Sequence, residues 1–170
     1  MTILETERLL LRQFKADDAE FIFELLNDPS WIQNIGDRNI RTLDDACAYI
    51  VNGPAASYAK NGFGLWLVAL KETNESIGMC GLIRRENLED VDIGYALLPR
   101  FWGKGYAVEA ARAAKDYAKD VVGLKRLVAI VDPTNQGSIR VLEKLGLRYE
   151  KMVRLAADDI DLKFFAIDFE

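Results

Sequence analysis

Apolar and polar positions along the chain follow two periods, one typical of strands and one of helices. Residues 3–14 contain the apolar run Leu9-Leu10-Leu11 and predict a strand. A helix is expected next, because Asp17 is a suitable N-cap with Glu20 three residues later. Apolar residues then recur at helical spacing until Asn27-Asp28-Pro29 ends the helix.

The middle of the chain predicts a second helix and then a meander of strands. Thr42 is the expected N-cap of this helix, which should end near Gly53-Pro54. The strands are expected at Phe63 to Leu70, Ser76 to Arg84 and Val91 to Leu98. Short polar connections between these strands predict antiparallel hairpins.

The last third predicts two more helices and three strands. An alanine-rich helix is expected from Tyr106 to Asp120, followed by a strand from Leu127 to Val131 that should lie parallel to the strand before the helix. A final helix should run from Gln136 to Leu145 and stop at Gly146. A closing hairpin is expected, with strands at Leu147 to Leu155 and Ile160 to Phe169 and the turn Ala156-Ala157-Asp158-Asp159. The predicted order is β-α-α-β-β-β-α-β-α-β-β, a mixed α/β (α+β) class, in one domain spanning residues 1–170.

Composition narrows the function. Half of the 170 residues are hydrophobic and 29% are charged, which suits one compact domain. The net charge of −5 argues against nucleic acid as a partner and slightly favours a cationic substrate. We expect a cytoplasmic protein without membrane association, because no apolar run reaches about 20 residues and the first residues do not form a signal peptide. Cys47 and Cys80 suggest neither a disulfide framework nor a zinc site.

The chain has no histidine, which excludes Ser-His-Asp and Cys-His catalysis and most zinc hydrolases. Any acid or base must be a carboxylate, another side chain, water or the main chain. We expect no bound metal.

The turn Arg100-Phe101-Trp102-Gly103-Lys104-Gly105-Tyr106-Ala107 lies between a predicted strand and a predicted helix. Its glycines allow a ligand to approach the main chain closely. The first amides of a helix lack partners within it, and the helix dipole adds positive charge there, so the turn is suited to a pyrophosphate.

Other nucleotide sites fit this turn poorly. A phosphate-binding loop of the Walker type needs Ser or Thr after Gly-Lys, but Gly105 follows Lys104. A dinucleotide fingerprint needs Gly or Ala where Val108 stands, and it opens a repeated parallel fold. A tight turn without a ligand is the simpler alternative for an isolated Gly-x-Gly.

In context, Arg100-x-x-Gly103-x-Gly105-x-Ala107 resembles the acetyl-CoA signature of the GNAT acetyltransferase superfamily. The resemblance covers nearly the whole chain and points to the ribosomal-protein-alanine N-acetyltransferase (RimJ/RimL-like) branch. The segments that carry it are Arg8-Leu9-Leu10-Leu11-Arg12, Asn27-Asp28-Pro29, Thr42-Leu43-Asp44-Asp45-Ala46, Ile93-Gly94-Tyr95 and Asn135 to Gly146.

The resemblance implies a sheet whose central parallel strands splay apart to receive the pantetheine arm of acetyl-CoA. Main-chain partners for this arm would come from Leu97, Leu98 and Val131. The pyrophosphate would be bound by Arg100, Gly103, Lys104, Gly105, Tyr106 and Ala107. Asn135 matches a family asparagine that contacts the cofactor, and it also suits a helix cap.

Two catalytic side chains are expected from the same resemblance. Many relatives carry a tyrosine acid where this chain has Leu142, so Ser138 is the candidate that hydrogen-bonds the departing sulfur, although a serine in a first helical turn also caps or faces solvent. Asp92 stands where relatives often carry a glutamate and could drain the proton of the amine through water, or it could be a solvated strand residue. Glu86, Glu89 and Tyr95 are lesser candidates.

The expected activity is transfer of acetyl from acetyl-CoA to an amine: a protein N-terminus, an amino acid, a polyamine or another small amine. The main alternative is a non-catalytic domain that senses acyl-CoA. Trp31 should lie in a loop, either as an acceptor wall or over the edge of the core. Trp66 and Cys80 should be core residues, and Trp102 should pack under the glycine turn. The chain should be a monomer or a homodimer.

Overall fold

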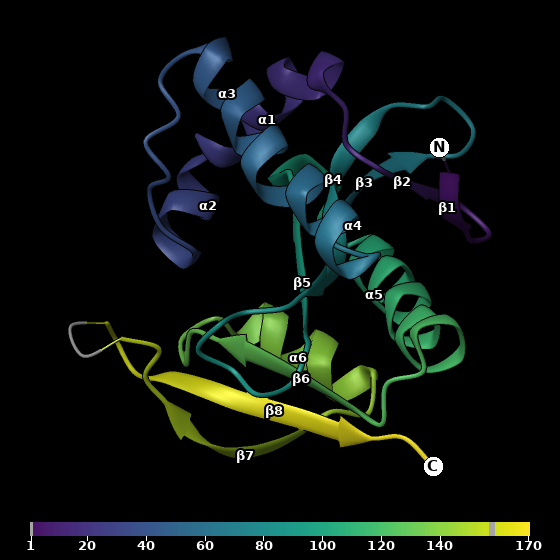
Figure 1. Cartoon of the computed structure of the whole chain (residues 1–170), viewed down its shortest axis with the longest axis vertical. Helices are drawn as coiled ribbons and strands as arrows, with labels where there is room; N and C mark the ends of the chain where they lie inside the picture. The colour runs from purple at the N-terminus through teal and green to yellow at the C-terminus, as the bar shows by residue number, and fades with distance from the viewer. Residues whose placement is uncertain (1, 157–158) are drawn as a thin grey trace.

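The computed structural model describes residues 2–156 and 159–170 (Figure 1). In chain order its strands are β1 (Thr2–Glu5), β2 (Leu9–Arg12), β3 (Leu65–Leu70), β4 (Ser76–Ile83), β5 (Asp92–Leu97), β6 (Arg126–Val131), β7 (Arg148–Val153) and β8 (Leu162–Asp168). Its α-helices are α1 (Ala19–Leu26), α2 (Pro29–Asn34), α3 (Leu43–Ile50), α4 (Ala56–Asn61), α5 (Tyr106–Tyr117) and α6 (Gln136–Lys144). None of these helices has the length and apolar character needed to cross a bilayer.

The described strands form one sheet in the order β1-β2-β3-β4-β5-β6-β8-β7. Neighbouring strands are antiparallel except β5 and β6, which are parallel and are joined through α5. The prediction of a mostly antiparallel sheet with one central parallel pair is therefore confirmed.

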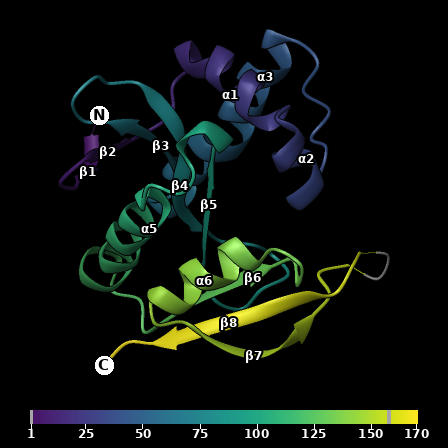
Figure 2. The same ribbon diagram turned by 180° about the vertical axis from the view of Figure 1, so that it is seen from behind.

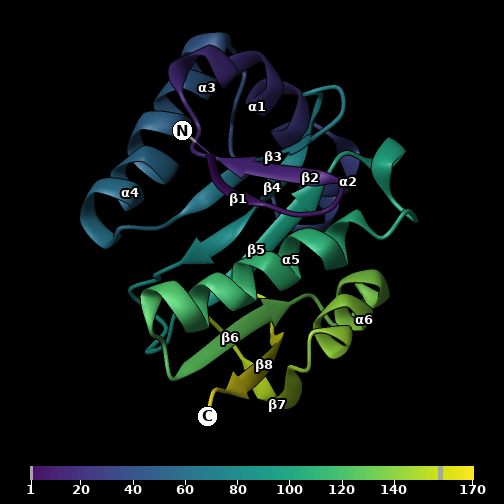
Figure 3. The ribbon, with the colours of Figure 1, turned by 90° about the vertical axis from the view of Figure 1, so that its right-hand side faces the viewer.

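Helices cover both faces of the N-terminal half of this sheet. Figure 3 shows α1, α3 and α4 on one side and α5 on the other, and Figure 2, the view of Figure 1 from behind, also shows α5 apart from α1 and α3. On the α5 face, the ring of Trp66 packs edge-on against Tyr117, with centroids 5.0 Å apart. Cys80 and Tyr95 share this face, because Trp66 pairs with Cys80 and Cys80 with Tyr95 across the sheet.

Local sequence signals correctly predicted the start of α3 and the end of α6. Thr42 Oγ1 accepts a hydrogen bond from the amide of Asp45 at 3.0 Å, and the Asp45 carboxylate accepts one from the amide of Thr42. This capping box starts α3 as predicted. Gly146 follows α6 with a φ of 94°, the left-handed conformation expected of a glycine that ends a helix.

The single strand predicted for residues 3–14 is wrong, because the chain folds back between β1 and β2. The amide of Thr6 donates to the carbonyl of Leu9 at 2.9 Å, and Thr6 Oγ1 accepts from the amide of Leu9 at 3.0 Å. Both bonds close a turn in the middle of the predicted strand. The helix α5 then fixes this turn from a distance, since Glu109 accepts from the amide of Arg8 at 2.9 Å.

The first helical region begins differently from the prediction that Asp17 is its cap. A 3-10 turn, η1 (Ala16–Asp18), precedes α1. The carboxylate of Asp18 accepts from the amide of Lys15 at 2.9 Å and pairs with the Arg12 guanidinium at 2.8 Å. Asp18, not Asp17, is therefore the residue before α1, and its carboxylate is held by Arg12 and the amide of Lys15 instead of capping the first amides of α1.

The second predicted helix does not end at Gly53-Pro54. It continues from α3 through a π-helical segment, η2 (Val51–Ala55), into α4, and ends at Gly62 with a φ of 79°. The wider π turn accommodates Pro54, which has no amide hydrogen. Similarly, α5 continues into the π-helical η4 (Ala118–Val122).

Trp31 lies in a helix rather than a loop. Asp28 caps α2 through a bond from the amide of Ser30 at 2.9 Å, and Pro29 occupies the first helical position. Trp31 is buried in the core, as are Trp66 and Cys80. The closing hairpin β7–β8 is present as predicted, while Ala157 and Asp158 of its expected turn lie outside the described residues.

Candidate active site

The parallel strands β5 and β6 separate after one pair of residues. Asp92 is opposite Val128, and the amide of Val128 donates to the carbonyl of Val91 at 3.1 Å. No further β5–β6 pair occurs within the described residues, whereas β5 pairs with β4 and β6 with β8 along their lengths. Main-chain groups on the facing edges of β5 and β6 are therefore left without strand partners.

Strand register decides which main-chain groups face this divergence. The carbonyl of Val91 points toward β6. The N–H and C=O groups of alternate residues point to the same edge of a strand, so those of Tyr95 and Leu97 also point toward β6. The amide of Leu98 instead donates to the carbonyl of Ile77 at 2.9 Å, on the other edge. The amide of Leu98, a residue expected to offer main-chain groups to the pantetheine arm, is therefore directed away from the gap.

The same reasoning shifts the expected partner on β6 by one residue. The main-chain amide of Val128 points toward β5, so the main-chain groups of Ile130 do too, while those of Val131 point toward its partner Lys163 in β8.

The carbonyl of Leu97 accepts a hydrogen bond from Trp102 Nε1 at 2.9 Å. Trp102 is 52% exposed and so does not pack under the turn as expected.

The turn before α5 presents amides that no side chain among the described residues caps. After the 3-10 turn η3 (Pro99–Phe101), Gly103 and Gly105 adopt φ values of 75° and 83°, in the left-handed region. Gly105 is the N-cap of the 12-residue α5 and has no side chain to bond the first amides. The amides of Tyr106 and Ala107 therefore stand at a positive helix end without a side-chain cap, which suits an anion.

The two basic residues of this turn differ in their surroundings. Arg100 is turned toward α1, where Nη1 pairs with Glu24 at 3.0 Å, and Nη2 lies 4.0 Å from Glu75. Lys104 is exposed at the turn. Lys104 is thus the better placed of the two for a phosphate.

Arg8 braces the same turn from the side of β2, a role that the sequence analysis missed. Its Nη1 donates to the carbonyl of Lys104 at 2.9 Å, its Nε pairs with Glu109 at 2.7 Å, and its guanidinium lies 4.4 Å from the centre of the Tyr106 ring. The resemblance marked Arg8 as part of a motif, but nothing local to it indicated a contact with residues about a hundred positions away.

Ser138 lies in the first turn of α6. Asn135 is the N-cap of this helix, and its Oδ1 accepts from the amide of Ser138 at 3.2 Å. Tyr95 donates from its hydroxyl to Ser138 Oγ at 2.8 Å, joining β5 to α6. Burial raises the pKa of Tyr95 to about 12, so its hydroxyl keeps its proton near neutral pH. Leu142, where relatives carry a tyrosine, is buried.

Asp92 is buried rather than solvated, with 1% of its surface exposed. Its Oδ2 accepts from Arg85 Nε at 2.8 Å, and its Oδ1 has no hydrogen-bond partner among the described residues. Burial raises the pKa of Asp92, and the charge of Arg85 acts against this shift. A buried carboxylate oxygen without a partner is costly and marks a place where a polar ligand or water is needed.

Asp92 and Tyr95 point to opposite faces of β5, since side chains alternate along a strand. Tyr95 lies on the α5 face with Ser138, and Asp92 on the face of α3. Ser138 and Asp92, the two expected catalytic residues, therefore lie on opposite sides of β5. Glu86 and Glu89, the lesser candidates, are exposed.

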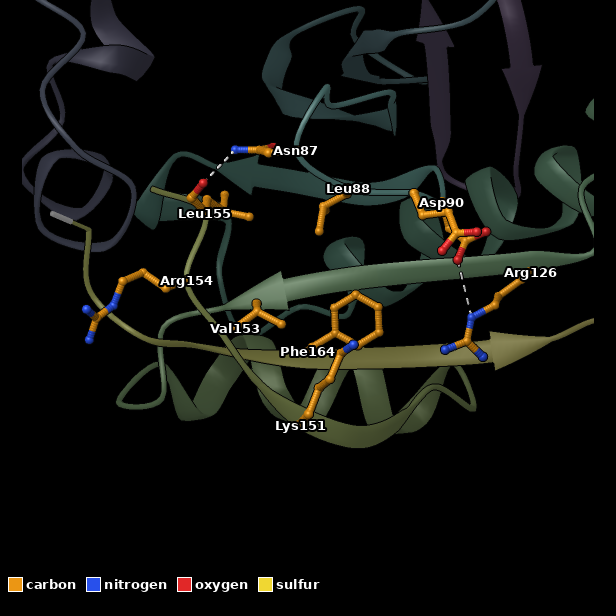
Figure 4. Close-up of a pocket in the computed structure, with 10 residues that line it drawn as sticks. Asn87, Leu88, Asp90, Arg126, Lys151, Val153, Arg154, Leu155 and Phe164 are labelled. Atoms are coloured by element: carbon orange, nitrogen blue, oxygen red, sulfur yellow. Dashed lines mark hydrogen bonds and ion pairs between the residues drawn. The ribbon is translucent and has the colours of Figure 1, made fainter. Parts of the chain in front are cut away.

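A surface cavity of about 430 Å³ lies on the same face as Asp92 (Figure 4). Its apolar floor includes Leu88 and Phe164, which cluster with Val128, the residue opposite Asp92. Charged side chains form its rim, where Arg126 pairs with Asp90 at 3.4 Å. A second cavity, of about 350 Å³, lies behind the glycine turn and is lined by Arg8 and Tyr106 among others.

The described residues offer no thiolate at Cys80 and no cluster of side chains suited to a metal ion. Burial raises the pKa of the Cys80 thiol to about 12, so it carries no thiolate near neutral pH. The residues described contain no cluster of three acidic, cysteine or histidine side chains able to hold a metal ion.

Comparison with known proteins supports this arrangement. Residues 8–148 match the acetyltransferase (GNAT) domain family. The chain is 32% identical over 153 residues to the uncharacterized N-acetyltransferase YoaA of Bacillus subtilis, covering 89% of this chain and 86% of that protein. Its fold matches the crystal structure of an acetyltransferase from Agrobacterium tumefaciens, with 28% identity, a TM-score of 0.83 and coverage of 99% and 95% of the two chains. It also matches the ribosomal L7/L12 acetyltransferase RimL in complex with coenzyme A, with a TM-score of 0.84, 18% identity and coverage of 99% and 98%.

Proposed function

Because the chain belongs to the GNAT acetyltransferase family, we propose that it transfers the acetyl group of acetyl-CoA directly to a primary amine. The observation that carries this proposal is the juxtaposition of the uncapped amides of α5 with the divergence of β5 from β6. The amides would bind a diphosphate, and the divergence leaves strand edges free for an extended chain. Together they would fit the pyrophosphate and the pantetheine arm of acetyl-CoA.

The turn from Gly103 to Ala107 would hold the diphosphate through its amides, with Lys104 adding a cation and Arg100 able to join it only by leaving Glu24. Leu97 and Ile130 would offer main-chain groups to the pantetheine arm. The side chain of Asn135 would fix the first turn of α6 beside it.

In the reaction, the amine nitrogen attacks the thioester carbonyl, the C–N bond forms, and the C–S bond breaks with its electron pair on sulfur. Asp92 would accept the proton of the amine through water, for which its unpartnered Oδ1 is suited. Ser138 would hydrogen-bond the departing sulfur. The amine would approach from the face of Asp92 and the cosubstrate from the face of α5 and α6.

The acceptor amine is proposed only as a class: a protein N-terminus, an amino acid, a polyamine or another small amine. We propose membership of the RimJ/RimL-like branch, because Asn135 to Gly146 and Ile93-Gly94-Tyr95 resemble that branch in order and spacing. We also propose that the reaction takes place in the cytoplasm, and that the chain acts as a monomer or homodimer.

The test is turnover by the purified full chain. Acetyl-CoA is incubated with amino acids, polyamines and short peptides with free N-termini, and both released thiol and acetylated product are measured. We expect thiol and product in equal amounts with at least one amine. Binding of CoA in calorimetry without any product from the panel would favour the acyl-CoA sensor, and failure to bind CoA would contradict both functions.

A further inference from the structure

The hydrogen bond between Tyr95 and Ser138 connects the two elements that flank the divergence of the sheet. Tyr95 comes from β5, and Ser138 comes from the helix that follows β6. The two oxygens are 2.8 Å apart, and both side chains are half-buried. A tether of this kind fixes the serine hydroxyl beside β5, next to the divergence of the sheet.

The direction of the bond matters for the chemistry. A serine hydroxyl has one hydrogen and two lone pairs. When Tyr95 donates to Ser138 Oγ, the serine hydrogen stays free for another acceptor. Since donation into an oxygen polarises its own O–H bond, the serine becomes a stronger donor than it would be alone.

Two more contacts hold the pair in place. The amide of Ser138 is bonded to Asn135 Oδ1 at 3.2 Å, which limits rotation of the first turn of α6. On the strand side, Tyr95 is paired with Cys80, whose buried neutral thiol brings no competing charge. The tyrosine hydroxyl therefore has Ser138 as its partner among the described residues.

We propose that Tyr95 is a positioning residue for acetyl transfer, which acts by donating to Ser138 so that the serine hydroxyl stabilises the departing CoA thiolate. This inference rests on the proposed function, because it needs CoA in the divergence of β5 and β6. Tyr95 thereby supplies from β5 a tyrosine hydroxyl that Leu142 cannot supply from α6.

The direct test measures the thiol of bound CoA. The thiolate is followed by its ultraviolet absorbance as pH is raised, in complexes of CoA with the wild type, Tyr95→Phe, Ser138→Ala and the double variant. One hydrogen bond to a charged group corresponds to about one pH unit in the thiol pKa. We expect each single variant to raise that pKa by about this amount and the double variant to raise it no further than Ser138→Ala.

Tyr117→Phe is the matched control. Tyr117 lies on the same face of the sheet, packed on Trp66, and its hydroxyl has no hydrogen bond to a described residue. It should leave the thiol pKa at its wild-type value. With an acceptor in hand, Tyr95→Phe should lower kcat about tenfold while KM for acetyl-CoA stays unchanged. Ser138→Thr, which keeps the hydroxyl, should retain more activity than Ser138→Ala.

The outcomes separate this inference from the proposed function. If CoA does not bind the wild type, the proposed function fails. If CoA binds and the thiol pKa is the same in Tyr95→Phe and the wild type, or if the effects of the two variants add in the double variant, Tyr95 does not act through Ser138 and only this inference is overturned.

Discussion

Arg8 donates from Nη1 to the main-chain carbonyl of Lys104 at 2.9 Å, so a residue of the first turn of the chain fixes the conformation of the turn before α5. The same guanidinium pairs with Glu109 in the first turn of that helix. The amides proposed to bind the diphosphate are thus held in place from behind, which reduces the ordering cost that binding would otherwise carry.

Arg8→Ala should weaken CoA binding about tenfold. The change removes one hydrogen bond to the turn and one partly exposed ion pair, together worth about 1 to 2 kcal/mol. Calorimetry with CoA measures the effect. Arg41→Ala is the control, since Arg41 is also paired with a carboxylate, that of Asp37, at 2.7 Å but lies in an exposed loop. Equal affinity of the two variants would show that the brace does not matter for binding.

Gly105→Ala should weaken CoA binding at least tenfold, with a loss of stability of about 1 to 2 kcal/mol from the left-handed conformation. An added Cβ would lie 3.3 Å from Arg8 Nη2 and would stand where a ligand must approach the main chain. Gly123→Ala is matched in backbone strain, with a φ of 81° against 83°, but its Cβ would meet open space. It should lose similar stability and keep its affinity for CoA. Similar losses of affinity in both variants would refute a specific role for Gly105.

Asn135→Ala should reduce both stability and turnover. Loss of the helix cap costs about 1 kcal/mol, and the freed amide no longer holds Ser138 in place. Thr42→Ala removes a cap of the same kind from α3, where Thr42 accepts from the amide of Asp45. Thermal unfolding should give comparable losses for both, while acetyl transfer should fall only in Asn135→Ala. A matching fall in Thr42→Ala would mean that general stability, not the position of Ser138, limits turnover.

Much of the fold could be predicted because its signals are local. The caps at Thr42 and Asn135, the glycine after α6 and the polar turns between β3, β4 and β5 each depend on residues within a few positions of one another. The parallel pair β5–β6 followed from the strand-helix-strand order alone. The turn before α5 could also be predicted, because its glycines lie within a few positions of one another.

What the sequence could not provide depends on contacts across the chain. The break between β1 and β2 involves Glu109, and Asp18 is held before α1 by its pairing with Arg12. Which amides of β5 and β6 face the divergence depends on hydrogen-bond register, and an alternating pattern of side chains does not reveal it. The direction of the Leu98 amide and the bond from Tyr95 to Ser138 were for this reason not foreseen.

Asp92→Asn should change how stability depends on pH. Burial raises the pKa of Asp92 above its ordinary value of 3.8, with Arg85 acting against the shift, so the folded state holds this proton more tightly than the unfolded state. The stability contributed by the carboxyl group is therefore present at low pH and is lost as pH rises through the raised pKa. Asparagine has nearly the same shape and no charge, and so removes this dependence.

Chemical denaturation of the wild type and Asp92→Asn between about pH 4 and pH 8 measures the difference. Relative to the variant, the wild type should lose stability as pH rises. Arg85→Gln should deepen this loss, because it takes away the cation that offsets burial of the carboxylate. Turnover of the wild type should rise with pH over the interval in which its stability falls, since a base must be unprotonated, and Asp92→Asn should be slow with no such rise. Parallel stability curves for the wild type and Asp92→Asn would show that the carboxyl group has the same proton affinity folded and unfolded, and a preserved rise in turnover would assign the base to another group.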